Sequence, residues 1–189
     1  MPKDTVTELM KDADRHMLEA IEATKGEFSM IRTGRANPAL LDRVLVEYYG
    51  EMVPIKHVSS ISVPEARVLM ISPWDKAMTK PIMDAITSSD LGVNPNSDGS
   101  VIRIPLPRLT TERRRELARL VARKTEEGKV AVRNTRRDTL ERLRVLQKEG
   151  EISEDDLRRF QEQLQKITDA HIEQLDELHG SKEREIMEG

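Results

Sequence analysis

The sequence contains no cysteine, and only 3% of its 189 residues are aromatic. The absence of cysteine excludes disulfide bonds, thiolate metal ligands and a thiol nucleophile. The low aromatic content disfavours a β-sandwich, and it also disfavours the binding of single-stranded nucleic acid by stacking bases on aromatic rings. With 34% charged residues and nine glycines, the composition is typical of long charged helices that pack through aliphatic side chains.

Long apolar runs are also missing. The longest, such as "VLMI" at 68–71, are far too short to span a bilayer. The N-terminal residues "MPKDTV" are not followed by the apolar segment of a secretory signal. We therefore expect a soluble cytoplasmic protein with no membrane partner.

The motifs of common catalytic sites are absent: the sequence has no HExxH pair, no P-loop and no GxSxG. Its four histidines are scattered, and His171 lies on an apolar stripe, where a packed core residue is expected rather than a ligand. The stretch "NPNSDG" at 94–99 resembles the start of a calcium loop, but its twelfth position is Pro105, where a glutamate is required. The sequence predicts no catalytic site, no metal site and no cofactor, so an enzyme is the weakest of the functional classes.

Three stretches have the periodicity of amphipathic helices. Apolar or small residues recur at helical spacing along 4–31, 117–146 and 157–178. Thr110 is placed to cap the second helix, and Ser153 and Asp156 are spaced to form a capping box at the start of the third. Three such helices in one chain favour an antiparallel three-helix bundle and a monomer over an intermolecular coiled coil, because each helix can bury its narrow stripe against the other two.

Residues 32–107 have a different pattern, with glycines, prolines and short β-rich runs. The runs are "VLVEYYG", "VSSISV", "RVLMIS" and "VIRI", and one helix is expected near "KPIMDAI" in the order β-β-β-α-β. The predicted fold is therefore α+β: a bundle of residues 1–31 plus 108–189, with an inserted small β/α/β domain at 32–107. We expect Trp74 to be a plug in the core or between the domains.

Two short segments connect the predicted domains, "RTGR" at 32–35 and "PLP" at 105–107. Glycine permits backbone conformations that other residues avoid, whereas proline stiffens the chain. This combination favours a hinge, although a phosphate contact or an ordinary glycine turn at the end of the helix remain alternatives. The predicted hinge residues are Arg32, Thr33, Gly34, Arg35, Pro105, Leu106 and Pro107.

Positive charge is concentrated in the second long helix. Residues 110–149 contain 13 Lys and Arg against 7 Asp and Glu, a charge of +6, whereas the remainder of the chain carries -9. A rotation of about 100° per residue places most of these basic side chains opposite the apolar stripe. A solvated helix surface is one interpretation, but few acidic residues share that side, and a long cationic face suits the phosphates of folded RNA or of a duplex.

Several motifs together resemble the bacterial ribosome recycling factor family: "IRTGRANP", "VEYYG", "SDLGVNPN", "IPLPRLTTERRREL", "VRNTRRD" and "EISEDD". Their order and spacing match over nearly the whole chain. The resemblance implies an L-shaped molecule in which a three-helix bundle carries the small domain. It also implies ribosome recycling after translation termination, with elongation factor G and GTP, on large-subunit ribosomal RNA near the peptidyl-transferase and intersubunit region. The small domain would face elongation factor G.

The candidate RNA-binding residues are Arg114, Lys129, Arg133, Arg136 and Arg137, and the last three lie in the family motif. The motif has a threonine at 135 where an aliphatic residue is expected, which concerns packing rather than the RNA face. A structural or chaperone-like coiled-coil protein is the competing class. It would explain the helices but neither the inserted domain nor the cationic face.

Overall fold

The computed structural model describes residues 2–188, so the two terminal residues of the predicted bundle ranges lie outside the description. Two compact units are present. One contains the chain up to Ile31 together with Glu112–Met187, and the other contains Arg32–Thr111. The first unit is thus formed by two separate parts of the sequence, between which the second is inserted.

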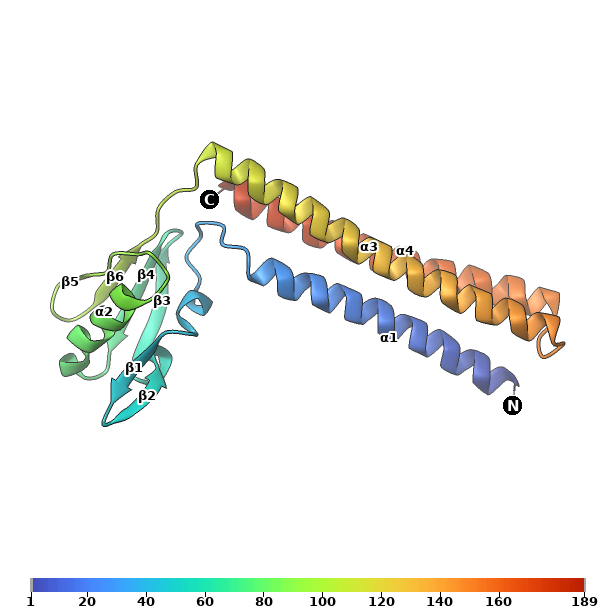
Figure 1. Ribbon diagram of the computed structural model, residues 1–189, viewed down its shortest axis with the longest axis horizontal. Helices are drawn as coiled ribbons and strands as arrows, with labels where there is room; N and C mark the ends of the chain where they lie inside the picture. The colour runs from blue at the N-terminus through green and yellow to red at the C-terminus, as the bar shows by residue number, and fades with distance from the viewer. Residues whose placement is uncertain (1, 189) are drawn as a thin grey trace. The chain divides into compact units, whose positions relative to one another are not determined.

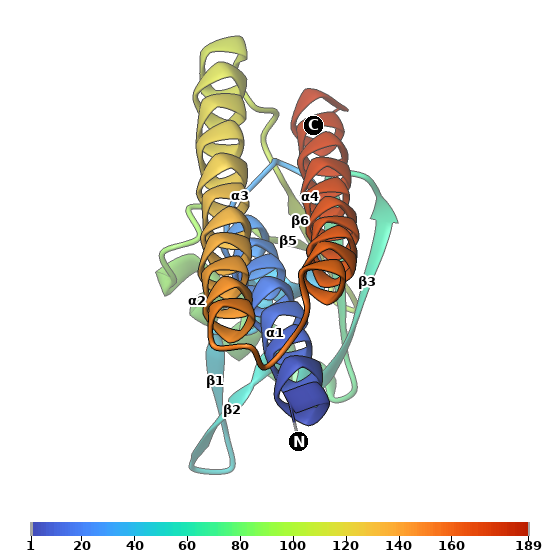
Figure 2. The same ribbon diagram turned by 90° about the vertical axis from the view of Figure 1, so that its right-hand side faces the viewer.

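The first unit is a bundle of three long helices, α1 (Pro2–Ser29), α3 (Thr111–Lys148) and α4 (Glu154–Glu188). They lie side by side, with α3 running opposite to α1 and α4 (Figures 1 and 2). Met17 and Ile21 of α1, Val132 and Leu143 of α3, and Leu175 of α4 are at most 1% exposed. The predicted antiparallel three-helix bundle is confirmed, and its core is aliphatic because the apolar stripes of all three helices meet.

The turn between α3 and α4 is fixed by local hydrogen bonds. Gly150 adopts a φ of +76°, and the next N–H, from Glu151, donates to the carbonyl of Leu146 at 2.9 Å, which ends α3 in a Schellman-type cap. Ser153 Oγ accepts from the N–H of Asp156 at 3.0 Å, and Asp156 Oδ2 accepts from the N–H of Ser153 at 3.4 Å. The predicted capping box at the start of α4 is therefore confirmed.

The three helices pack closely around Gly128 of α3. A Cβ atom at this position would lie 2.6 Å from Oγ1 of Thr24 on α1 and 3.2 Å from Cδ2 of Leu175 on α4. Both distances are shorter than ordinary van der Waals contact, so no larger residue fits without a shift of its neighbours. Gly128 therefore allows the three helices to share one packed layer at the centre of the bundle.

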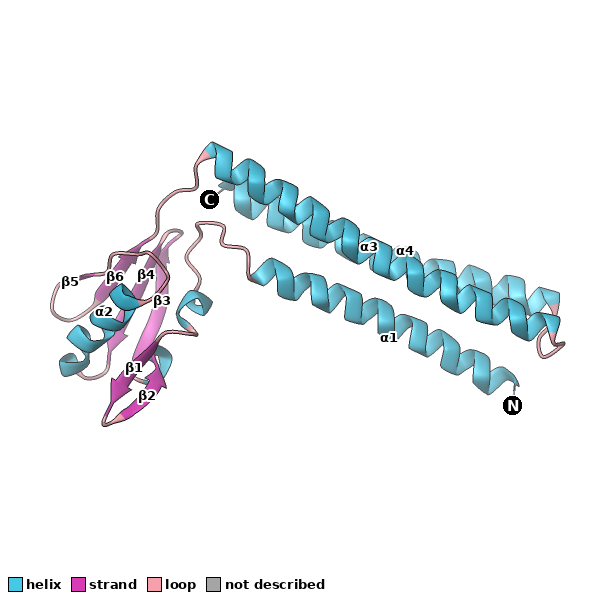
Figure 3. Cartoon of the chain, in the orientation of Figure 1, coloured by secondary structure: helices cyan, strands magenta, loops and turns pink. Residues whose placement is uncertain are grey.

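The second unit contains six strands and one α-helix (Figure 3). In chain order these are β1 (Leu45–Tyr48), β2 (Glu51–Pro54), β3 (Ser59–Glu65), β4 (Val68–Pro73), α2 (Thr79–Ser88), β5 (Asn96–Ser97) and β6 (Ile102–Pro105). Strands β1 and β2 form an antiparallel hairpin, and the other four form an antiparallel sheet in the order β3-β4-β6-β5. This architecture confirms the predicted α+β fold.

The core of the second unit lies between α2 and the sheets. Ile82 and Ile86 are spaced four residues apart on α2, and alternate residues of β4 and β6, such as Ile71 and Ile104, are also fully buried. The helical and strand periodicities therefore direct their apolar side chains into one cluster. Trp74, which follows β4, is 70% exposed, so the expectation that it plugs a core is wrong.

The predicted strand order omitted β2 and β5. The run "VLVEYYG" contains the first strand and the turn of a hairpin, because Tyr49 and Gly50 have φ values of +49° and +83° and join β1 to β2. A positive φ at tyrosine is uncommon, so the turn was not evident from its residue types. Strand β5 has only two polar residues, Asn96 and Ser97, and offers no apolar alternation to detect.

Candidate nucleic-acid interface

Helix α3 carries the positive charge of the bundle on a long exposed surface. Its 38 residues correspond to a length of about 57 Å at the rise of an α-helix. Leu117, Val121, Val132 and Leu143 are at most 2% exposed and define its packed side. Away from that side lies a row of exposed arginines, which we name the arginine face: Arg115, Arg119, Arg123, Arg133, Arg137 and Arg144.

Few acidic groups neutralise the arginine face. A nitrogen of the Arg133 guanidinium lies 3.2 Å from Oε1 of Glu126, and both side chains are more than half exposed. Nε of Arg137 is 3.8 Å from Oδ1 of Asp138, and the Arg137 side chain is 70% exposed. Exposed pairs of this kind are screened by water and contribute little. Both guanidinium groups therefore stay accessible to the oxygens of an anionic partner.

The other three predicted RNA-binding residues lie elsewhere on α3. Lys129 is 19% exposed, and its Nζ forms an ion pair with Asp176 of α4. Arg136 donates a hydrogen bond to Oε1 of Gln165, also on α4, at 3.2 Å. Arg114 is only partly exposed at the start of α3. The structure thus brings Arg133 and Arg137 together on the arginine face, and places Lys129 and Arg136 on the flank that borders α4.

The opposite flank of α3 is tied to α1 by another lysine. Lys124 Nζ lies 2.9 Å from Oε2 of Glu27 on α1 and 3.3 Å from Oε2 of Glu127. Hydrogen bonds to Glu27 and then to Glu127 raise the pKa of the Lys124 amine. Lys124 was not among the predicted site residues, and its ion pairs indicate that it joins helices rather than facing a ligand.

Three of the five predicted site residues lie in the family motif, and the prediction left out several members of the arginine face. Arg115, Arg119 and Arg123 precede the motif by two to five helical turns. Arg115 and Arg119 share the direction of Arg133 and Arg137, because each lies 18 residues, or five full helical turns, before its counterpart. The helical projection contained this signal, and the structure shows that all three are exposed.

The predicted hinge residues lie close to the edge of the second unit. Gly34 has a φ of +77°, and a Cβ at this position would meet Leu109 Cγ at 3.3 Å and the carbonyl oxygen of Pro107 at 3.4 Å. The N–H of Leu106 donates to the carbonyl of Arg67 at 2.7 Å, and Pro105 is the last residue of β6. Pro105 and Leu106 are therefore anchored to the sheet.

Thr33 is 3% exposed, whereas Arg32 and Arg35 are exposed. The N–H of Ala36 donates to the carbonyl of Ala66 at 2.8 Å, which anchors the end of the first connection to the β3–β4 turn. Within this connection Gly34 supplies the left-handed backbone conformation that the change of chain direction requires.

Among residues 5–188, no three histidine, aspartate or glutamate side chains are grouped to hold a metal ion. His171 is 8% exposed, and its Nε2 lies 2.7 Å from Oδ1 of Asp14, so it is a packed bundle residue as expected. In the loop that resembled a calcium site, Asp98 Oδ1 accepts from the N–H groups of Ser100 and Val101 and from the Ser100 hydroxyl. These donors lower the pKa of the Asp98 carboxyl to about 2.

Across the described part of the chain, no helix combines the length and apolarity that are needed to cross a bilayer. A helical bundle with one arginine-rich exposed helix, joined to a small α+β unit, defines a two-unit protein suited to binding a polyanion.

The chain belongs to the ribosome recycling factor family: the model of that family, described as "Ribosome recycling factor", matches residues 24–187. The chain is 56% identical over 179 residues to the ribosome-recycling factor of Rubrobacter xylanophilus, covering 95% of this chain and 96% of the relative. It is 54% identical over 181 residues to the ribosome-recycling factor of Halalkalibacterium halodurans, covering 96% of this chain and 98% of that relative.

Two solved structures are similar over nearly the whole chain. The first is a solution structure of the ribosome recycling factor, with a TM-score of 0.74 and 43% identity, covering 97% of this chain and 98% of that one. The second belongs to models of the T. thermophilus ribosome recycling factor and the E. coli elongation factor G bound to the E. coli post-termination complex. Its TM-score is 0.64 at 43% identity, with 96% and 98% of the two chains covered.

Proposed function

We propose that the protein recycles ribosomes in the cytoplasm after translation termination, acting as a monomer. It binds the post-termination ribosome on large-subunit ribosomal RNA, near the peptidyl-transferase and intersubunit region. With elongation factor G and GTP it promotes splitting into subunits and release of mRNA and tRNA. Family membership supports the recycling role, and the similar structure described with elongation factor G on a post-termination complex supports the choice of partners.

The observation that carries the RNA-binding part of this proposal is the arginine face of α3. Its guanidinium groups project from a rigid helix whose other side is held in the bundle core. They can therefore meet phosphate oxygens without reorganisation of the backbone, and a planar guanidinium can bind a phosphate through two hydrogen bonds. Residues of α1 and α4 carry mostly acidic charge, so binding through those helices would be repulsive and the orientation on RNA would be restricted.

The test replaces exposed arginines on different helices. Arg133→Ala and Arg137→Ala should each weaken binding to large ribosomal subunits by about 1 to 3 kcal/mol if their hydrogen bonds to phosphate are shielded from water. Arg15→Ala is the matched control, because Arg15 is on α1 and is 61% exposed. Sedimentation with purified subunits at several salt concentrations would measure each affinity, and each lost phosphate contact should reduce the salt slope by about one.

An equal loss for Arg15→Ala would mean diffuse attraction rather than docking through α3, and no loss for either α3 variant would reject the proposed interface. Arg144→Ala, nearer the far end of α3, should have a smaller effect than Arg133→Ala. A coiled-coil scaffold without a ribosomal role would stay in the supernatant even at low salt, which separates it from the proposed function.

We also propose that the chain is not an enzyme and that the hydrolysis of GTP belongs to elongation factor G. The sequence offers no phosphate-binding loop. Its contribution would then be mechanical, through the predicted hinge residues around Gly34 and the proline-containing second connection. Light scattering of ribosomes should show splitting only when the protein, elongation factor G and GTP are all present. GTP turnover by the isolated protein would contradict this assignment.

A further inference from the structure

One edge of the β1–β2 hairpin has no strand partner among the described residues, since this sheet contains β1 and β2 alone. Tyr49 and Gly50 form a two-residue turn between the paired residues Tyr48 and Glu51. Such a turn is closed by a hydrogen-bonded pair, and bonded pairs alternate with non-bonded pairs along an antiparallel ladder. By this alternation the main-chain groups of Leu45 and Glu47 point away from β2, toward the free edge.

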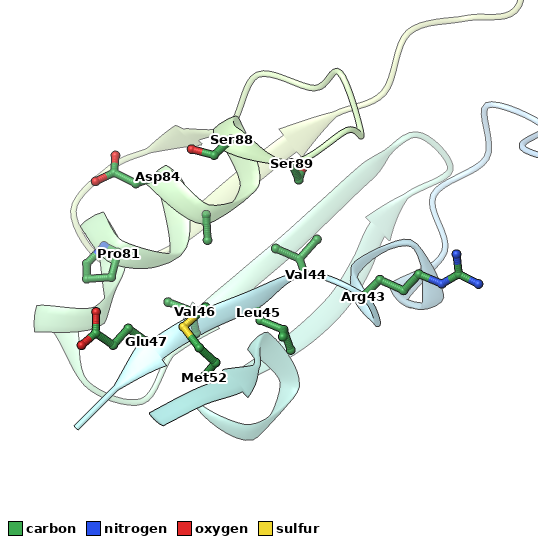
Figure 4. A pocket seen from close by; sticks show the side chains of 11 residues that line it. Arg43, Val44, Leu45, Val46, Glu47, Met52, Pro81, Asp84, Ser88 and Ser89 are labelled. Atoms are coloured by element: carbon green, nitrogen blue, oxygen red, sulfur yellow. The ribbon is translucent and has the colours of Figure 1, made fainter. Parts of the chain in front are cut away.

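A shallow, open groove lies along this free edge and is bordered on its other side by α2 (Figure 4). Small side chains of α2, such as Ala85 and Ser88, leave room beside the strand. Leu45 on β1 and Met52 on β2 also line the groove, and they are 45% and 61% exposed. An unpaired strand edge beside an accessible and partly apolar groove has the features of a site for an added strand.

Charged side chains lie at the two ends of the groove. Glu47 of β1 and Asp84 of α2 are at one end, and Arg43 is at the other (Figure 4). The two carboxylates make one end anionic, whereas the guanidinium makes the other cationic. An extended segment with a basic side chain at the first end and an acidic side chain at the second would complement both.

We propose that this groove binds an extended segment of a partner protein, which pairs with the outer edge of β1 and places a lysine or arginine next to Glu47 and Asp84. Main-chain hydrogen bonds to Leu45 and Glu47 provide the binding energy, and the charged ends select the sequence. Natural sheets often protect free edges by keeping them short and charged, but edge protection alone does not require an adjoining groove. The proposal goes beyond the recycling function and does not depend on the RNA interface.

The test uses the full chain and a synthetic probe, the acetylated and amidated peptide Thr-Lys-Val-Thr-Val-Glu-Thr. In antiparallel pairing its lysine lies opposite Glu47 and its glutamate opposite Arg43. Nuclear magnetic resonance titration should shift the amide signals of Leu45 and Glu47 and slow their hydrogen exchange. The same peptide with N-methyl groups on its lysine and central threonine has the same charge but cannot pair, so its affinity should fall at least tenfold.

Two variants separate main-chain pairing from charge. Leu45→Pro removes an N–H that points to the free edge and leaves the bonds to β2 intact, so it should abolish binding. Glu47→Gln keeps the backbone and should weaken binding several-fold. Unchanged Leu45 and Glu47 signals up to the solubility limit of the peptide, or equal binding of the N-methylated peptide, would overturn the proposal. Shifts that follow protein concentration without peptide would replace the partner with a second copy of the chain.

Discussion

Replacement of Gly128 by alanine should destabilise the bundle, although alanine is ordinarily the better helix former. In an unobstructed helix interior the change from glycine to alanine stabilises by about 0.5 to 1 kcal/mol. Here the added methyl carbon would lie 2.6 Å from Thr24 Oγ1 and 3.2 Å from Leu175 Cδ2. Insertion of a methyl group into a close-packed core costs about 1 to 3 kcal/mol, so the clash should outweigh the gain in helix propensity.

Gly26 provides the matched control. It lies in α1 of the same bundle, and a Cβ at this position would have no atom within 4 Å. Gly26→Ala should therefore raise the free energy of unfolding by about 0.5 to 1 kcal/mol. The free energies of unfolding of the two variants should differ by about 1 to 3 kcal/mol. Urea unfolding followed by circular dichroism at the helical band would measure that difference.

A double-mutant cycle identifies the clash. Thr24→Ala removes the hydroxyl that would lie closest to the new methyl group, although it leaves a small cavity. In the Thr24→Ala variant, the loss in free energy of unfolding caused by Gly128→Ala should be at least about 1 kcal/mol smaller than in the original chain. Residues in contact typically show interaction energies of about 0.5 to 3 kcal/mol in such cycles. If Gly128→Ala stabilised the original chain as much as Gly26→Ala does, the close packing of the three helices at this layer would be refuted.

Three further predictions concern a carboxylate, a cross-helix lysine and the connections. The hydrogen-bond donors of Ser100 and Val101 lower the pKa of Asp98 to about 2 from an ordinary value of 3.8. Their stabilisation of the loop should therefore be present above pH 3.8 and be lost as the pH falls through 2. A carboxyl titration by nuclear magnetic resonance with a midpoint near 3.8 would contradict this. Lys129→Met should lower bundle stability by less than about 1 kcal/mol and reduce ribosome binding less than Arg137→Ala does, and an equal loss in sedimentation would place Lys129 against RNA. Trypsin should cut first at Arg32 or Arg108, and mass spectrometry that found an earlier cut within α3 would reject the proposed hinge segments.

Much of the fold was predictable because each apolar stripe had a clear period. The bundle follows from stripes such as that containing Val132 and Leu143, and the capping box at Ser153 marked a helix start directly. The hairpin was harder to predict, because Tyr49 adopts a positive φ that its residue type does not indicate. The exposure of Trp74 was also missed, since a large aromatic residue is usually mostly buried.

For the candidate site, a helical projection separates the core from the surface but does not distinguish the outer face from the two flanks. Lys129 and Arg137 both project away from the apolar stripe in a single helix. The difference between them depends on where α4 packs, because Asp176 of that helix binds Lys129 whereas no residue of α4 is paired with Arg137 among the ion pairs of the described chain. Which helix packs against each side of α3 is a feature of the tertiary structure, and it could not be predicted from this one sequence.

The basic residues of α3 include two groups: lysines on its flanks that pair with neighbouring helices, and the arginine face between them. This arrangement explains how the bundle can hold the arginine face in a fixed direction. Lys124 pairs with Glu27 on one flank of α3, and Lys129 pairs with Asp176 on the other. These contacts limit rotation of α3 about its own axis, because rotation in either direction would break one pair and expose part of the apolar stripe. Arg133 lies between the flanks and projects outward, so its position follows from pairs that themselves need not contact RNA. Loss of both flanking pairs should therefore make the orientation of the bound protein less uniform, even when every residue of the arginine face is retained.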